Sequence, residues 1–81
     1  MIEVVLYKAS WCGPCQQFEP IFNEAARSSK HTFSMVDIDT VDRQNLIEIE
    51  SIPTVVIYRD GQVGEILRGS DTKVSDILNL L

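Results

Sequence analysis

The stretch ASWCGPCQQF (residues 9–18) contains both cysteines of this 81-residue chain, Cys12 and Cys15, and Gly13 and Pro14 separate them. Two cysteines at this spacing can form a structural disulfide, supply half of a metal site, or act as a reactive dithiol. The segments on either side of the stretch indicate where in a fold the pair lies, and so bear on which interpretation fits.

Strand and helix patterns alternate around the cysteines. IEVVLY (residues 2–7) is an almost continuous apolar, β-branched run, which is typical of a strand buried on both faces. After the cysteines, apolar residues recur at the spacing of one helix face, and Pro14 suits the first turn of that helix. These apolar residues are Phe18, Ile21, Phe22, Ala25 and Ala26.

The rest of the chain continues this alternation. FSMVDI (33–38) predicts a second buried strand, and a short helix pattern follows at residues 42–49. Two further strands, at 54–58 and 63–67, flank Asp60-Gly61, which is a strong signal for a β-hairpin.

A last helix pattern closes the chain. Ser70 or Asp71 is its expected N-cap, and Val74, Ile77, Leu78 and Leu81 form its apolar stripe. The first strand–helix–strand unit should have parallel strands. The sequence therefore predicts one α/β domain over residues 1–81, with a four-stranded mixed sheet and helices on both faces.

Composition excludes several classes of partner. The net charge is −5, and the seven Lys and Arg residues are scattered, whereas nucleic-acid binding relies on clustered positive charge. The first residues lack the pattern of a secretory signal, and no apolar run approaches the ~20 residues that span a bilayer. We therefore expect a soluble cytoplasmic protein that binds neither nucleic acid nor membrane.

The structural and metal interpretations of the cysteine pair are the weaker ones. A disulfide across so short a loop removes little unfolded-state entropy, about 2 kcal/mol, and the cytosol opposes it. A zinc site needs four Cys or His ligands, but the chain offers two cysteines and His31, which we expect in a distant, solvated loop. We expect no metal and no organic cofactor.

The local features favour the reactive dithiol. Cys12 should lie at the N-terminus of a helix, where unpaired N–H groups and the helix dipole favour a thiolate and can lower a thiol pKa from about 8.5 to near 7. Cys15, one turn further on, should be less exposed and able to resolve a mixed disulfide formed by Cys12. Gly13 allows a tight turn and leaves room for a partner, and Pro14 stiffens that turn.

With these residues placed, the chain resembles the thioredoxin family. WCGPC (11–15) is that family's active-site motif, in the expected strand-to-helix context. The likeness continues through Pro20, VDID (36–39), SIPT (51–54), RDG (59–61) and Gly69.

The resemblance implies a substrate-binding surface. In thioredoxins the proline matching Pro53 is cis and lies beside the cysteines, which would expose the backbone of Ile52 for pairing with an extended substrate segment. The alternative for Pro53 is a proline that starts a strand. Trp11, Gly13, Pro14, Ile52 and Gly69 would form a docking patch around Cys12, although Trp11 could belong to the core and Gly69 to a simple turn.

Three departures from the family are visible. Thioredoxins usually begin with an additional strand and helix, whereas the first strand predicted here starts at Ile2; glutaredoxins and small glutaredoxin-like redoxins share this shorter plan. The family's buried aspartate, thought to accept the resolving cysteine's proton, aligns with Leu6. A lysine usual before the VDID-like segment aligns with Met35.

Two further positions have competing interpretations. Lys8 could support the Cys12 thiolate, or it could be a solvated lysine at the end of a strand. Ser70 and Asp71 occupy the position where glutaredoxins hold the carboxylate of glutathione, or they form a plain N-cap.

The resemblance implies a monomeric thiol–disulfide oxidoreductase. It would reduce disulfides of protein substrates, with Cys12 as nucleophile and Cys15 as resolving cysteine, and a thioredoxin reductase would restore its thiols. One alternative is a glutaredoxin-like redoxin that is recharged by glutathione or serves ribonucleotide reductase. A non-enzymatic alternative is a binding module that uses the same patch.

Overall fold

The computed structural model describes residues 1–41 and 49–81. Within them, the chain forms strand β1 (Ile2–Lys8), helix α1 (Gly13–Arg27), strands β2 (Thr32–Asp37), β3 (Thr54–Arg59) and β4 (Gln62–Arg68), and helix α2 (Val74–Leu78). These bounds confirm the four strands and the first and last helices expected from the sequence. The short helix expected at 42–49 falls outside the described residues, apart from Ile49.

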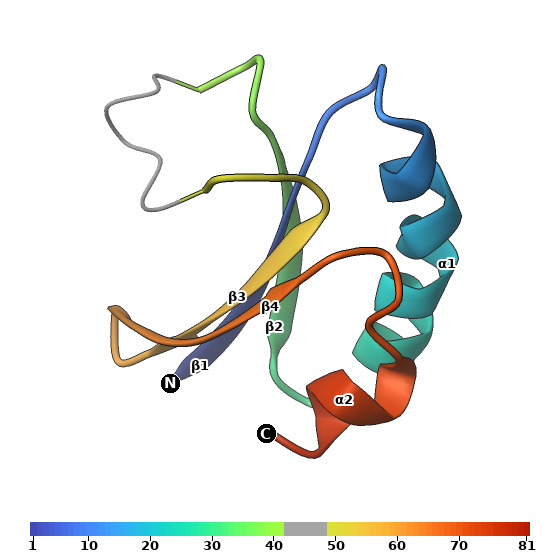
Figure 1. Ribbon diagram of the computed structural model, residues 1–81. Coiled ribbons are helices and arrows are strands. Elements are labelled where there is room, and N and C mark those ends of the chain that lie inside the picture. The colour runs from blue at the N-terminus through green and yellow to red at the C-terminus, as the bar shows by residue number, and fades with distance from the viewer. Residues whose placement is uncertain (42–48) are drawn as a thin grey trace.

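The four strands form one mixed sheet in the order β2-β1-β3-β4 (Figure 1). β1 pairs with β2 in parallel, as a strand–helix–strand unit requires, and with β3 in antiparallel orientation. β3 and β4 form the predicted hairpin. Asp60 and Gly61 have φ of 53° and 84°, the left-handed pair that a two-residue hairpin loop needs.

Both described helices cover the same face of the sheet (Figure 1). Alternate residues of the two central strands point into this side and are fully or almost fully buried: Val4 and Leu6 from β1, and Val55 and Ile57 from β3. The helices contribute Phe18, Phe22, Ala25 and Ile77. The apolar stripe that marked α1 in the sequence is therefore the side packed on the sheet.

The opposite face is built on Val5, Tyr7 and Val56. The hydroxyl groups of Tyr7 and Tyr58 are hydrogen-bonded at 2.6 Å on this side. Burial raises the pKa of Tyr58 above its ordinary value, and the bond to Tyr7 adds to this effect, so the Tyr58 hydroxyl stays protonated in an apolar setting. No described helix lies on this face, and the expected helix at 42–49 falls outside the described residues, so the expectation of helices on both faces stays a prediction.

Two expectations are corrected. β2 is not a buried strand: Thr32 and Ser34 are exposed, because β2 is an edge strand of the sheet. The N-cap of α2 is Lys73, not Ser70 or Asp71. A turn closed by the bond from Thr72 N–H to the carbonyl of Gly69 contains those two residues, so the helix begins later.

Candidate functional site

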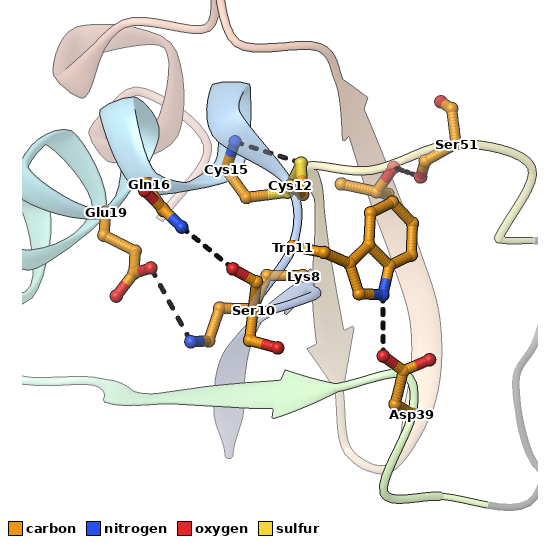
Figure 2. The surroundings of a disulfide bond; sticks show 10 residues. Lys8, Ser10, Trp11, Cys12, Cys15, Gln16, Glu19, Asp39 and Ser51 are labelled. Carbon is orange, nitrogen blue, oxygen red and sulfur yellow. Dashed lines mark hydrogen bonds and ion pairs between the residues drawn. A yellow bond between two sulfur atoms is a disulfide. The ribbon is translucent and has the colours of Figure 1, made fainter.

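Cys12 is the N-cap of α1, in extended backbone conformation, and its Sγ accepts a hydrogen bond from the N–H of Cys15 at 3.1 Å (Figure 2). Gly13 and Pro14 are the first two residues of the helix. In most N-caps a side-chain oxygen accepts a hydrogen bond from one of the unpaired N–H groups of the first turn. Here Sγ of Cys12 is the acceptor. The sequence prediction that Cys12 lies at a helix N-terminus is confirmed.

The two cysteines form a disulfide, with their Cα atoms 5.2 Å apart. Cys12 retains 6% of its surface in contact with solvent and Cys15 none, which confirms the expected order of exposure. Ala9 shares their cluster, and Ile38 and Ile52 pack against it. A partner can therefore approach the pair only at Cys12.

The turn between the cysteines is open to solvent. Gly13 and Pro14 are both exposed, and a Cβ added to Gly13 would meet no atom within 4 Å. The structure thus leaves space beside Cys12, as expected for Gly13.

A second loop lies against the cysteines. The Ile52–Pro53 peptide bond is cis, as the resemblance implied, and Ile52 packs against the cysteine cluster. Gly69, with φ of 97°, donates its N–H to the carbonyl of Pro53 at 3.0 Å. A chain of contacts therefore joins three segments that are far apart in sequence: residues 12–15, residues 52–53 and Gly69.

Trp11 is a surface residue, not part of the core, with 67% of its surface exposed. Its ring forms one wall of a pocket of about 230 Å³ beside the cysteine loop. The other lining residues are Ile38, Ile49, Glu50, Ser51 and Ile52. The pocket is mainly apolar, which suits a side chain of a bound polypeptide better than a charged small molecule.

Asp39 is a site residue that the sequence analysis did not identify. Its Oδ2 accepts a hydrogen bond from Nε1 of Trp11 at 2.7 Å (Figure 2). The backbone N–H of Asp39 donates to Oδ1 of Asp37 at 2.9 Å. The sequence carries no signal for this pair, because residues 11 and 39 are far apart in the chain and the parallel pairing of β1 and β2 brings them together.

Lys8 forms an ion pair with Glu19 on α1, with Nζ and Oε2 3.6 Å apart (Figure 2). The side-chain amide of Gln16, also on α1, donates to the carbonyl of Ser10 at 2.8 Å. Both contacts fasten the start of the helix to the end of β1. Lys8 is thus engaged in holding the cysteine loop in place.

The remaining candidate features lie away from this site. His31 is exposed in the connection before β2, where the sequence predicted it. In residues 1–41 and 49–81, no three His, Cys, Asp or Glu residues gather as metal ligands would. None of the helices in that part of the chain is long and apolar enough to cross a membrane.

Comparison with known proteins places this architecture in a family. A family model for thioredoxin matches residues 2–80. The chain belongs to the thioredoxin family. A thioredoxin of Mycoplasmoides gallisepticum is 44% identical over 64 residues, which are 76% of this chain and 64% of that protein. Thioredoxin Y2, a chloroplastic protein of Arabidopsis thaliana, is 36% identical over 83% of this chain and 42% of its own length.

Solved structures of thioredoxins agree with this assignment. A mutant thioredoxin from Halobacterium salinarum superposes with a TM-score of 0.86 at 25% identity, over 98% of this chain and 70% of that one. Fasciola hepatica thioredoxin gives a TM-score of 0.83 at 26% identity, over 98% and 79%. The chain spans less than two thirds of the length of both sequence relatives above.

One position expected to depart from the family is fully buried in the structure. Leu6, where the resemblance placed the family's buried aspartate, has no solvent exposure and lies in the apolar core beneath α1. Met35, the other substitution that the resemblance implied, packs against the same core.

The bond between Trp11 and Asp39 can be tested through fluorescence, because Trp11 is the only tryptophan of the chain. Asp39→Ala removes the acceptor, so we expect a more mobile indole, with lower steady-state anisotropy and faster quenching by acrylamide. Asp39→Asn keeps an acceptor oxygen and should behave like the wild type. Identical anisotropy in the alanine variant and the wild type would show that the bond does not hold the ring.

Proposed function

We propose that this protein is a thiol–disulfide oxidoreductase that reduces disulfides in protein substrates. The observation that carries the proposal is the placement of Cys12: it caps a helix, contacts a backbone N–H donor, and is bonded to a buried partner cysteine. A helix N-terminus stabilises negative charge, and thiolate is the form of cysteine that attacks disulfides.

The order of the reaction steps follows from the solvent exposure of the two cysteines, since only Cys12 has exposed surface. In the reduced protein, the Cys12 thiolate attacks one sulfur of a substrate disulfide, forming a mixed disulfide and releasing the other substrate sulfur as a thiolate. Cys15 then loses its proton and attacks the sulfur of Cys12, which releases the second substrate thiolate. Two electrons have passed to the substrate, and the protein is left with the Cys12–Cys15 disulfide.

The substrate segment would lie between Trp11 and the loop that carries Ile52 and Pro53. Extended chains bind such sites by main-chain pairing, with a side chain in an adjoining pocket. The pocket beside Trp11 and the open space over Gly13 support this placement. Pro14 and Gly69 complete the proposed docking patch, on the exposed turn and beside Pro53.

We further propose that one chain is the active unit and that it works in the cytoplasm. Both cysteines and every residue of the docking patch come from a single chain, which supports the first point. A cysteine pair suited to exchange, and not to permanent cross-linking, fits a reducing compartment.

Trapping tests the roles of the two cysteines. Cys15→Ser cannot resolve the mixed disulfide, so it should accumulate covalent complexes with substrate proteins in a lysate. Cys12→Ser lacks the nucleophile and should accumulate none. Non-reducing electrophoresis followed by mass spectrometry would detect the complexes and show whether ribonucleotide reductase is among them. Equal trapping by both variants, or by neither, would contradict the mechanism.

The charge state of Cys12 gives a second test. Because the helix N-terminus favours thiolate, alkylation of the reduced protein by iodoacetamide should have its pH midpoint at least one unit below that of free cysteine, about 8.5. Cys15→Ser isolates the signal of Cys12, and an unfolded sample in denaturant is the control. A midpoint equal to that of the unfolded sample would remove the physical basis of the proposal.

The proposed electron donor is a thioredoxin reductase and not glutathione. The likeness to thioredoxins, at WCGPC (11–15) and over residues 2–80, supports this choice. We expect NADPH with thioredoxin reductase to sustain reduction of insulin at least tenfold faster than glutathione with glutathione reductase. Faster turnover with glutathione would favour the redoxin alternative.

A further inference from the structure

The pocket of about 230 Å³ beside the cysteine loop combines apolar walls with a carboxylate. Figure 2 shows the ring of Trp11 beside the segment that carries Ser51, and both residues line the pocket. Three isoleucines supply its aliphatic lining: Ile38, Ile49 and Ile52. Of the described residues that line the pocket, Glu50 is the one that carries a charge, and Glu50 is exposed. A side chain that fills the pocket therefore meets both apolar surface and a negative charge.

The pocket lies at the end of the sheet that carries the cysteines. Trp11 directly precedes Cys12, and Ile52 both lines the pocket and packs against the cysteine cluster. β1 ends and β3 begins on this side, since Tyr7 of β1 pairs with Thr54 of β3. The start of β1 is at the opposite end of the sheet (Figure 1). A substrate segment whose sulfur reaches Cys12 therefore brings its neighbouring residues to this pocket.

The negative charge at the pocket is not neutralised within the described part of the chain. Glu50 and Asp39, whose carboxylate binds the indole of Trp11, form no ion pair with any lysine or arginine there. Lys8, the cation nearest to the cysteines in sequence, is paired with Glu19. The net charge of the whole chain is −5. The pocket should therefore attract a positive side chain and repel a negative one.

We propose that the pocket beside Trp11 selects substrates with a basic residue, arginine or lysine, within two residues of their reactive cysteine. The aliphatic stem of that residue packs on the isoleucines, its cationic group stacks on the indole, and Glu50 pairs with its charge. Arginine fits best, because a planar guanidinium stacks on an aromatic ring and binds a carboxylate through two hydrogen bonds. This inference rests on the proposed function and names the class of substrate that it serves.

The size of the preference follows from the exposure of Glu50. A leucine would fill the apolar part of the pocket equally well but would leave this carboxylate without a partner. Because ion pairs in contact with solvent are weak, arginine should be preferred over leucine about threefold. A glutamate would bring two like charges together, so arginine should be preferred over glutamate about tenfold.

Activated peptides measure this preference. Each peptide has one cysteine, joined in a mixed disulfide to 2-thiopyridine, in a background of glycine and serine. It carries one arginine, leucine or glutamate at one of the four positions within two residues of that cysteine. Attack of the Cys12 thiolate on the peptide sulfur releases 2-thiopyridone, whose absorbance gives the rate constant of mixed-disulfide formation. With the reduced Cys15→Ser protein, which isolates this step, arginine at one position or more should react about threefold faster than leucine and about tenfold faster than glutamate.

Substitutions of Glu50 identify the group that makes the selection. Glu50→Gln keeps the size of the side chain and removes its charge, so the ratio of the arginine to the leucine rate constant should fall to about one. Glu50→Lys should reverse the order, so that the glutamate peptide reacts faster than the arginine peptide. Glu24→Gln and Glu24→Lys are the matched controls. Glu24 is exposed near the other end of α1, so these variants change the net charge by the same amounts and should keep the wild-type order.

The outcomes separate this inference from the proposed function. Rate constants that do not depend on the substituted residue, or equal effects of the Glu24 and Glu50 variants, would overturn the selection of basic residues and leave the oxidoreductase in place. Leucine peptides that are the fastest at every position would overturn it as well. Failure of the reduced protein to attack any peptide would overturn both. Circular dichroism would establish that every variant is folded, and high salt should weaken the preference.

Discussion

The hydrogen bond from the N–H of Cys15 to Sγ of Cys12 is the interaction on which the site depends. It exists because α1 begins directly after Cys12, and α1 begins there because Gly13 and Pro14 form its first turn and Phe18 and Phe22 bury its next two turns on the sheet. The position of the sulfur is therefore set by the packing of the helix. Any change that moved the start of α1 would move Cys12 away from the donors that favour its charged form.

The rest of the site is assembled by the sheet. Parallel pairing of β1 with β2 brings Asp39 to Trp11, and antiparallel pairing of β1 with β3 brings the cis Ile52–Pro53 bond beside the cysteines. Loops that follow or precede neighbouring strands at one end of the sheet meet there, as is common in α/β proteins. The ion pair of Lys8 with Glu19 then holds the start of α1 to the end of β1.

The strands at the centre of the described sheet are more buried than the strands at its edges. β1 and β3 are central and largely buried, but β2 is an edge strand, half exposed, with its outer hydrogen-bonding groups unpaired by any strand in the described part of the chain. On the face away from α1 and α2, the bonded hydroxyls of Tyr7 and Tyr58 lie over an otherwise apolar surface.

The sequence by itself determined the four strands, the first and last helices, the hairpin at Asp60-Gly61 and the place of Cys12 at a helix N-terminus, because hydrophobic periodicity, turn residues and helix-start signals are local properties. Only the tertiary structure decided that β2 is an edge strand, that Asp39 binds Trp11 and that Lys8 binds Glu19. It also decided that α2 begins after Lys73, since a turn anchored at Gly69 contains Ser70 and Asp71. These features depend on contacts between residues distant in sequence, for which the chain carries no local signal.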